Sequence, residues 1–152
     1  MSDFIKNLLR SSNPKKLIHP FFGPLSLFEN KQLNRCYWNG EIAFEGQSIA
    51  LRIDTNKDSP NENHIIFFTR TLKNLNWVIK ESTYFIANSF EIWTDKTYLE
   101  NFLDEFKCVA LDIPFKGKAT NNWQITFARC SDEDFVFTVY FVNNKVESTD
   151  LD

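Results

Sequence analysis

Two histidines are the residues of this chain that could most readily do acid–base or metal chemistry. Such chemistry needs partners, because a metal ion or a catalytic base works only where several side chains converge. His19 and His64 lie far apart in the sequence, and neither has a second histidine or a cysteine at ligand spacing. His19 stands directly before Pro20, a position that indicates support of a turn rather than chemistry.

The three cysteines, Cys36, Cys108 and Cys130, are an odd number without C-x-x-C spacing. This pattern indicates reduced, buried thiols that bind no metal. The four glycines are too scattered for a phosphate-binding loop, and the acidic residues of 95–105 are interpreted as helix caps and solvated faces. We therefore expect no catalytic residue, no cofactor and no metal, and a protein that is not an enzyme.

Hydrophobic periodicity predicts the elements that would have to position any site. It predicts an α+β fold and a single domain over 1–152, with helices packed on one face of an antiparallel sheet. The expected order is strands, helices, strands. A short helix is expected at 3–10, strands at about 24–54, helices at about 60–106 and strands at about 107–148.

Apolar and polar residues alternate through 35–44, which predicts one long strand that turns at Glu45-Gly46-Gln47. The alternative is a tight turn at Asn39-Gly40, which is the stronger local hairpin signal. We prefer the long strand because the alternation continues through Gly40. In both versions the next strand directs Ile49, Leu51 and Ile53 to its inner side.

Helical spacing predicts a long helix after Asp58-Ser59-Pro60, with a break near Ser82-Thr83, and a further helix capped by Thr94-Asp95. Alternation then predicts C-terminal strands, with a turn at Asn143-Asn144. The apolar face of the first helix is expected to pack on Phe44, Leu51 and Ile53, and it consists of Ile65, Phe68, Leu72, Leu75 and Ile79.

Charge is distributed unevenly along the 152 residues, whose net charge is -3. Residues 1–20 are basic, whereas 131–152 hold six acidic residues against Lys145 alone. An acidic end argues against nucleic-acid binding and suits a basic protein partner. No apolar run reaches the roughly 18 residues of a membrane span, and no signal peptide is evident. We expect a cytoplasmic protein that contacts neither nucleic acid nor membrane.

Three short motifs stand together in the first third of the chain: His19-Pro20-Phe21-Phe22-Gly23, then Trp38-Asn39-Gly40, then the apolar segment 49–53. In these motifs the chain resembles a family of small uncharacterised bacterial domains that are similar to immunity proteins of polymorphic-toxin systems. Such proteins bind and block a cognate toxin. The resemblance implies a helical hairpin over 60–106 and a C-terminal sheet. The chain departs from that pattern in 121–152, which lacks the expected Gly and His.

The leading functional hypothesis is a non-enzymatic immunity protein that occludes the active site of a basic toxin domain. Its expected partner-binding residues are the acidic run Asp132, Glu133 and Asp134, placed in a turn between two C-terminal strands, and the exposed aromatic residues Tyr37 and Trp38. The alternative is a small-molecule-binding or regulatory module with a pocket between helices and sheet. An enzyme of unrecognised type is the remaining rival.

Overall fold

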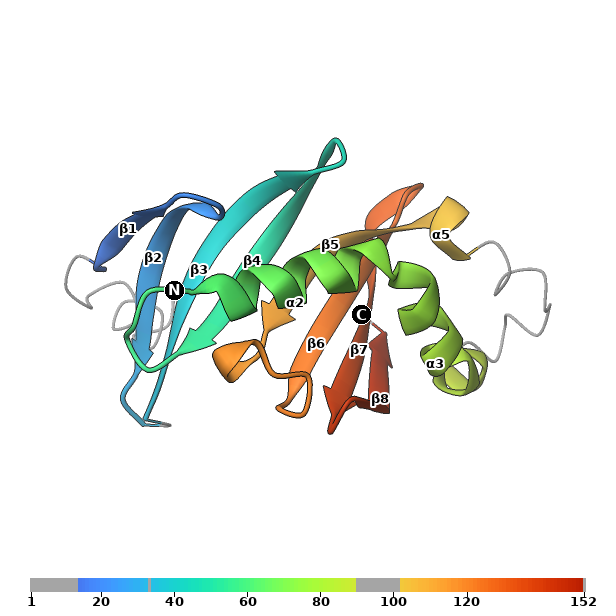
Figure 1. Cartoon of the computed structure of the whole chain (residues 1–152). Coiled ribbons are helices and arrows are strands. Elements are labelled where there is room, and N and C mark those ends of the chain that lie inside the picture. The colour runs from blue at the N-terminus through green and yellow to red at the C-terminus, as the bar shows by residue number, and fades with distance from the viewer. Residues whose placement is uncertain (1–13, 33, 90–101, 152) are drawn as a thin grey trace, which may run out of the picture.

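One eight-stranded sheet forms the centre of the computed structural model, which describes residues 14–32, 34–89 and 102–151 (Figure 1). The strands follow one another across the sheet in chain order. All neighbouring strands are antiparallel except β4 and β5, which run parallel. The strands are β1 (Lys16–His19), β2 (Gly23–Asn30), β3 (Arg35–Phe44), β4 (Gln47–Thr55), β5 (Phe106–Ile113), β6 (Trp123–Arg129), β7 (Asp132–Val142) and β8 (Lys145–Leu151).

Helical segments occupy the connections on either side of β5. Among the described residues, the helices between β4 and β5 are α2 (Glu62–Lys73), α3 (Leu75–Ser89) and α5 (Phe102–Glu105), and a 3-10 turn, η1 (Phe115–Gly117), follows β5. A long crossover of this kind is what parallel neighbours require. The α+β class is confirmed. The prediction of a purely antiparallel sheet with a single block of helices on one face is wrong. The sheet is mixed, strands dominate the structure, and η1 lies among the C-terminal strands.

The start of α2 is fixed by a reciprocal cap. The side chain of Asn61 accepts a hydrogen bond from the backbone N–H of Asn63 at 3.0 Å, and Nδ1 of His64 accepts one from the backbone N–H of Asn61 at 3.1 Å. This arrangement satisfies two backbone donors that a helix end otherwise leaves without partners. The helix therefore begins just after the predicted Asp58-Ser59-Pro60 segment.

The break between α2 and α3 falls at Asn74 and not near Ser82-Thr83. The side-chain amide of Asn74 donates to the carbonyl of Arg70 at 2.7 Å and ends α2 there. The hydroxyls of Ser82 and Thr83 bond to carbonyls one turn earlier, at 2.6 and 3.1 Å, so α3 continues through both residues. The predicted helices at 3–10 and after Thr94-Asp95 fall largely outside the described residues.

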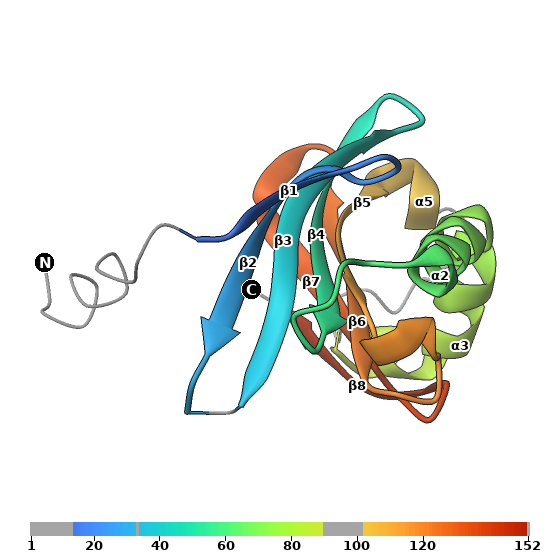
Figure 2. The ribbon, with the colours of Figure 1, turned by 60° about the vertical axis from the view of Figure 1, so that its left-hand side comes forward.

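One face of the sheet, which we call the inner face, packs against α2 to form the core, as Figure 2 shows from the side. The ring of Phe68 in α2 meets the rings of Phe22 and Phe44 edge-on, with centroids 5.8 and 5.6 Å away. Phe68, Leu72 and Ile79 are buried as predicted, although Ile79 belongs to α3, whereas Ile65 and Leu75 are only half buried. The largest side chains that are almost completely buried are Trp38, Phe22, Phe68, Phe106, Phe127, Phe137 and Phe141.

The long β3 strand is confirmed, and the turn lies at Glu45 and Gly46, where φ is positive. The chain does not turn at Asn39-Gly40, because Gly40 packs closely against the neighbouring strand β2. A Cβ on Gly40 would lie 2.4 Å from Cδ2 of Leu25, its partner on β2. A side-chain-free position is needed there for close packing, which gives the N-G pair a role other than a hairpin turn.

Two details of the strands differ from expectation. The strand β1 was not predicted, since the N-terminal strands were expected to begin at about 24. In β5, the register shifts between Cys108 and Ala110, so that Val109 is an extra, bulged residue. Cys108 therefore takes the buried position expected for Val109. The Asn143-Asn144 turn is confirmed, with φ of 51° and 60°, the left-handed values that a two-residue hairpin needs.

Candidate functional site

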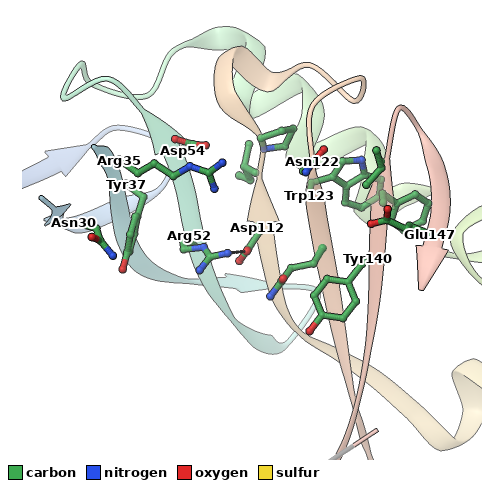
Figure 3. A pocket seen from close by; sticks show the side chains of 15 residues that line it. Asn30, Arg35, Tyr37, Arg52, Asp54, Asp112, Asn122, Trp123, Tyr140 and Glu147 are labelled. Carbon is green, nitrogen blue, oxygen red and sulfur yellow. Dashed lines mark hydrogen bonds and ion pairs between the residues drawn. The ribbon is translucent and has the colours of Figure 1, made fainter. Parts of the chain in front are cut away.

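The outer face of the sheet points away from the core and carries polar and aromatic side chains. We define it by Tyr37, Arg52, Asp112, Gln124 and Tyr140, which alternate along their strands with buried residues. A cavity of about 360 Å³ opens on this face, beside the ends of β4 and β5 (Figure 3). Side chains from β2 to β8 surround it.

Strand register brings these residues together from distant parts of the sequence. Residues directly opposite one another on neighbouring strands lie close enough for their side chains to interact. The site therefore depends on the parallel pairing of β4 with β5, which joins the N-terminal four strands to the C-terminal four. The opposing pairs that line the cavity include Tyr37 with Asp54, Arg52 with Asp112, and Gln124 with Tyr140.

A row of interacting side chains crosses β2 to β5 on this face. The ring of Phe28 stacks on Tyr37 with centroids 5.6 Å apart, and the guanidinium of Arg52 lies 5.4 Å from the centre of the Tyr37 ring. Arg52 also forms an ion pair with the carboxylate of Asp112. These contacts fix the orientation of the Tyr37 side chain.

The carboxylates of the cavity are incompletely compensated. Burial raises the pKa of Asp112 to about 6, although the nearby Arg52 acts in the opposite direction. Burial also raises the pKa of Asp54, against the opposing effects of Arg35 and Arg52. Glu147 of β8 is a third carboxylate at the cavity. Three carboxylates thus face two arginines, and a positively charged group placed here would be stabilised.

The structure separates the two aromatic residues that were expected to bind a partner. Tyr37 lines the cavity, whereas Trp38 points into the core, is 1% exposed and donates from Nε1 to the carbonyl of Asp58 at 2.8 Å. The expectation that Trp38 is an exposed anchor is wrong, because successive residues of a strand point to opposite faces.

The acidic run Asp132, Glu133 and Asp134 is exposed, but it begins β7 and does not form the turn, which consists of Cys130 and Ser131. None of the three lines the cavity. Glu133 forms an ion pair with Lys107, which lowers the pKa of Glu133 and raises that of Lys107. The run therefore adds negative charge to the strand that carries Tyr140, some distance from the cavity itself.

Both histidines have structural roles. Nδ1 of His19 accepts from the backbone N–H groups of Phe21 and Phe22, each at 3.1 Å, and Nε2 lies 3.1 Å from the carbonyl of Pro60. His19 thus holds the β1–β2 turn, as its place before Pro20 indicated. His64 caps α2, and burial lowers its pKa. In the described segments, no three His, Cys, Asp or Glu side chains converge as a metal site requires.

The cysteines occupy three different environments. Cys108 is buried, and burial raises the pKa of its thiol to about 12, so it is unreactive at neutral pH. Cys36 is half buried and Cys130 is exposed, so the expectation that all three are buried thiols is wrong for Cys130. Across the described part of the chain, no helix has the length and apolar composition to cross a membrane.

Arg52, Asp54, Asp112 and Tyr140 were not singled out by the sequence. A signal for them does exist, because each alternates with core residues along a strand and so belongs to the opposite face. The sequence does not contain a local signal for the pairing that brings β5 next to β4.

No family model, no curated protein and no solved structure matches the chain.

Proposed function

We propose that this is a non-enzymatic, cytoplasmic binding protein that covers a basic protein partner with its outer face. In its most specific form, it is an immunity protein that neutralises a cognate bacterial toxin by occluding the active site. The observation that carries the proposal is the ordered row of Tyr37, Arg52 and Asp112 beside a cavity on the outer face of the sheet.

The residue types of this face suit a protein–protein interface. Tyrosine and arginine are enriched among the residues that contribute most to binding, and they do so best when the free protein already holds them in place. Tyr37 is held between Phe28 and Arg52, and Tyr140 stands on β7 on the far side of the cavity. Both lie on strands, which move less than loops.

The charge of the face indicates the chemistry of the partner. Asp54, Asp112 and Glu147 outnumber Arg35 and Arg52 around the cavity, and the exposed acidic run begins the same strand that carries Tyr140. A basic side chain of the partner would offset the cost of the partly buried carboxylates. Charges farther out would chiefly speed association with a basic surface.

The test uses the purified product of the reading frame next to this one in its genome. We expect this product to bind the wild-type protein and to lose binding with Tyr37→Ala by about tenfold or more, the effect of a central tyrosine. The matched control is Tyr84→Ala, which removes an exposed tyrosine, 72% accessible, from α3. Calorimetry measures both affinities, and co-expression tests whether the protein restores growth.

Two outcomes would contradict the proposal. If Tyr84→Ala weakens binding while Tyr37→Ala does not, the partner binds the helical side and the outer face is not the interface. If the neighbouring product neither binds nor inhibits growth, the immunity role is wrong.

A further inference from the structure

A second cavity, of about 350 Å³, lies on the helical side of the sheet, and we call it the helix-side cavity. It is bordered by α2, the first turn of α3, the segment from η1 to β6 and the β7–β8 turn. Its volume is within the range of small-molecule sites, roughly 300–1,000 Å³. Nothing proposed for the outer face involves this cavity.

Aromatic rings form the walls of the helix-side cavity. Trp123 of β6 meets Phe67 of α2 edge-on, with centroids 5.1 Å apart, and stacks on Phe141 at 3.9 Å. Trp77 of α3 stacks on the same Phe141 at 5.9 Å. Ile66 and Trp77 remain 54% and 38% exposed there. A flat apolar group that covered these side chains would remove apolar surface from water.

The charge of this cavity is opposite to that of the outer face. Arg70 lines it, and the guanidinium of Arg70 takes part in no ion pair with a described residue. None of the described lining residues is an Asp or Glu. Lys118 stands between two lining residues in the chain, and Lys145 directly follows another. Arg70 also complements the C-terminal dipole of α2, a role that leaves its donors available to an anion.

One buried donor at the cavity has no acceptor. Trp123 is 5% exposed, and its Nε1 has no hydrogen-bond partner within the described residues. An unsatisfied buried donor is unfavourable, so native proteins usually supply a water or a ligand at such positions.

We propose that the helix-side cavity binds a small aromatic carboxylate. The ring of the ligand packs on Ile66 and on the exposed side of Trp77, beside Phe67 and Trp123, and its carboxylate pairs with Arg70. A carboxylate suits a guanidinium because two parallel hydrogen bonds can form. The position between helix and sheet is the one expected for a small-molecule or regulatory module. The site does not depend on a protein partner at the outer face.

The probe is 3-phenylpropionate, and its uncharged amide, 3-phenylpropanamide, is the matched control ligand. Titration of the full chain is followed by NMR at the indole N–H signals of the tryptophans. We expect the Trp77 and Trp123 signals to shift, and the carboxylate to bind at least about tenfold more tightly than the amide. Arg70→Gln should abolish that preference and leave amide binding unchanged. Arg52→Gln, on the outer face, should change neither.

Each contrary result overturns the inference. These results are an absence of shifts up to about 10 mM probe, equal affinity for carboxylate and amide, and an unchanged preference in Arg70→Gln. Ile66→Glu is an independent variant, because it adds a carboxylate at an exposed position of the cavity and should repel the probe. Binding of the neighbouring gene product is measured separately, so failure of this site leaves the proposed function intact.

Discussion

The cavity of the outer face and the helix-side cavity lie on opposite sides of the sheet, and their lining residues carry opposite charges. Around the outer cavity three carboxylates face two arginines, whereas Arg70 lines the helix-side cavity without any described Asp or Glu. Trp123 contributes to both linings. The linings differ because strands β2 to β8 supply most of the outer cavity, whereas helices α2 and α3 and two connecting segments supply most of the helix-side cavity.

The side chains of the two regions are also held in place by different kinds of contact. On the outer face, Tyr37 is ordered by side chains of neighbouring strands, and its contacts contribute little to the core. On the helical side, the aromatic walls are themselves part of the core, since Phe67, Trp123 and Phe141 are buried. Substitutions on the outer face should therefore change binding more than stability, and substitutions beneath the helices should do the reverse.

The largest effect is expected for Leu72→Ala, which tests that division directly. Leu72 of α2 is 6% exposed in the core, so its truncation should lower the free energy of unfolding by about 2–5 kcal/mol. Ile66→Ala in the same helix is the control, because Ile66 is 54% exposed and should cost far less. Urea unfolding measures both. A loss below about 0.5 kcal/mol for Leu72→Ala would mean that α2 does not pack on the sheet as described.

The next effect is a pH dependence that belongs to the outer face. Asp112 titrates near 6 in the folded protein instead of at its ordinary 3.8, and the pKa of Asp54 is raised in the same direction. Between these values the folded state holds a proton that the unfolded state has lost. Stability should therefore fall as pH rises from about 4 to about 6, and the contribution of Asp112 should then stay constant.

Asp112→Asn removes this titration. The difference in unfolding free energy between the variant and wild type should therefore change in favour of the variant by up to about 3 kcal/mol between pH 4 and pH 7. Urea unfolding at several pH values measures the difference. Arg52→Gln is a control with the opposite expected effect. Loss of the guanidinium should raise the pKa of Asp112 further, so that stability continues to fall up to a higher pH. Parallel profiles for wild type and Asp112→Asn would contradict the burial of this carboxylate.

Local signals in the sequence were sufficient for much of the fold. The turns at 45–47 and at Asn143-Asn144 were predicted from the points where the alternation of apolar residues ends, and the structure has positive φ at Glu45, Gly46 and both asparagines. The core side of α2 was predicted from its periodicity. By contrast, the parallel pairing of β4 with β5 depends on how the crossover packs, and nothing near either strand encodes it. Arg52 lies opposite Asp112 because of that pairing, and this contact could not be predicted from the sequence either.

The wrong prediction that Trp38 is exposed had a different cause, because the alternation in the sequence already indicated that Trp38 lies on the buried side of its strand. The alternation that placed Trp38 on one side with Gly40 and Phe44 also placed Tyr37 on the other. Treating both aromatic residues as exposed ignored this alternation. The helix-side cavity could not be predicted in the same way, since it requires four chain segments to meet.

The smallest expected effect concerns the acidic run, which lies outside both cavities. Replacing Asp132, Glu133 and Asp134 with Ser should leave the urea midpoint nearly unchanged. All three are exposed, and of the three only Glu133 forms an ion pair with a described residue, Lys107. Binding to the neighbouring gene product should become slower, chiefly in the association rate.

Stopped-flow measurements at several salt concentrations separate this steering effect from direct contact. The difference from wild type should be a few-fold at low salt and should disappear as salt screens charges beyond about 10 Å. A control variant removes the same charge elsewhere, at the exposed Glu62, Glu81 and Asp104, each changed to Gln. If that control slows association equally, net charge alone steers the partner. If the Ser variant associates at the wild-type rate at every salt concentration, the acidic run has no part in recognition, and recognition rests on Tyr37, Arg52 and the cavity beside them.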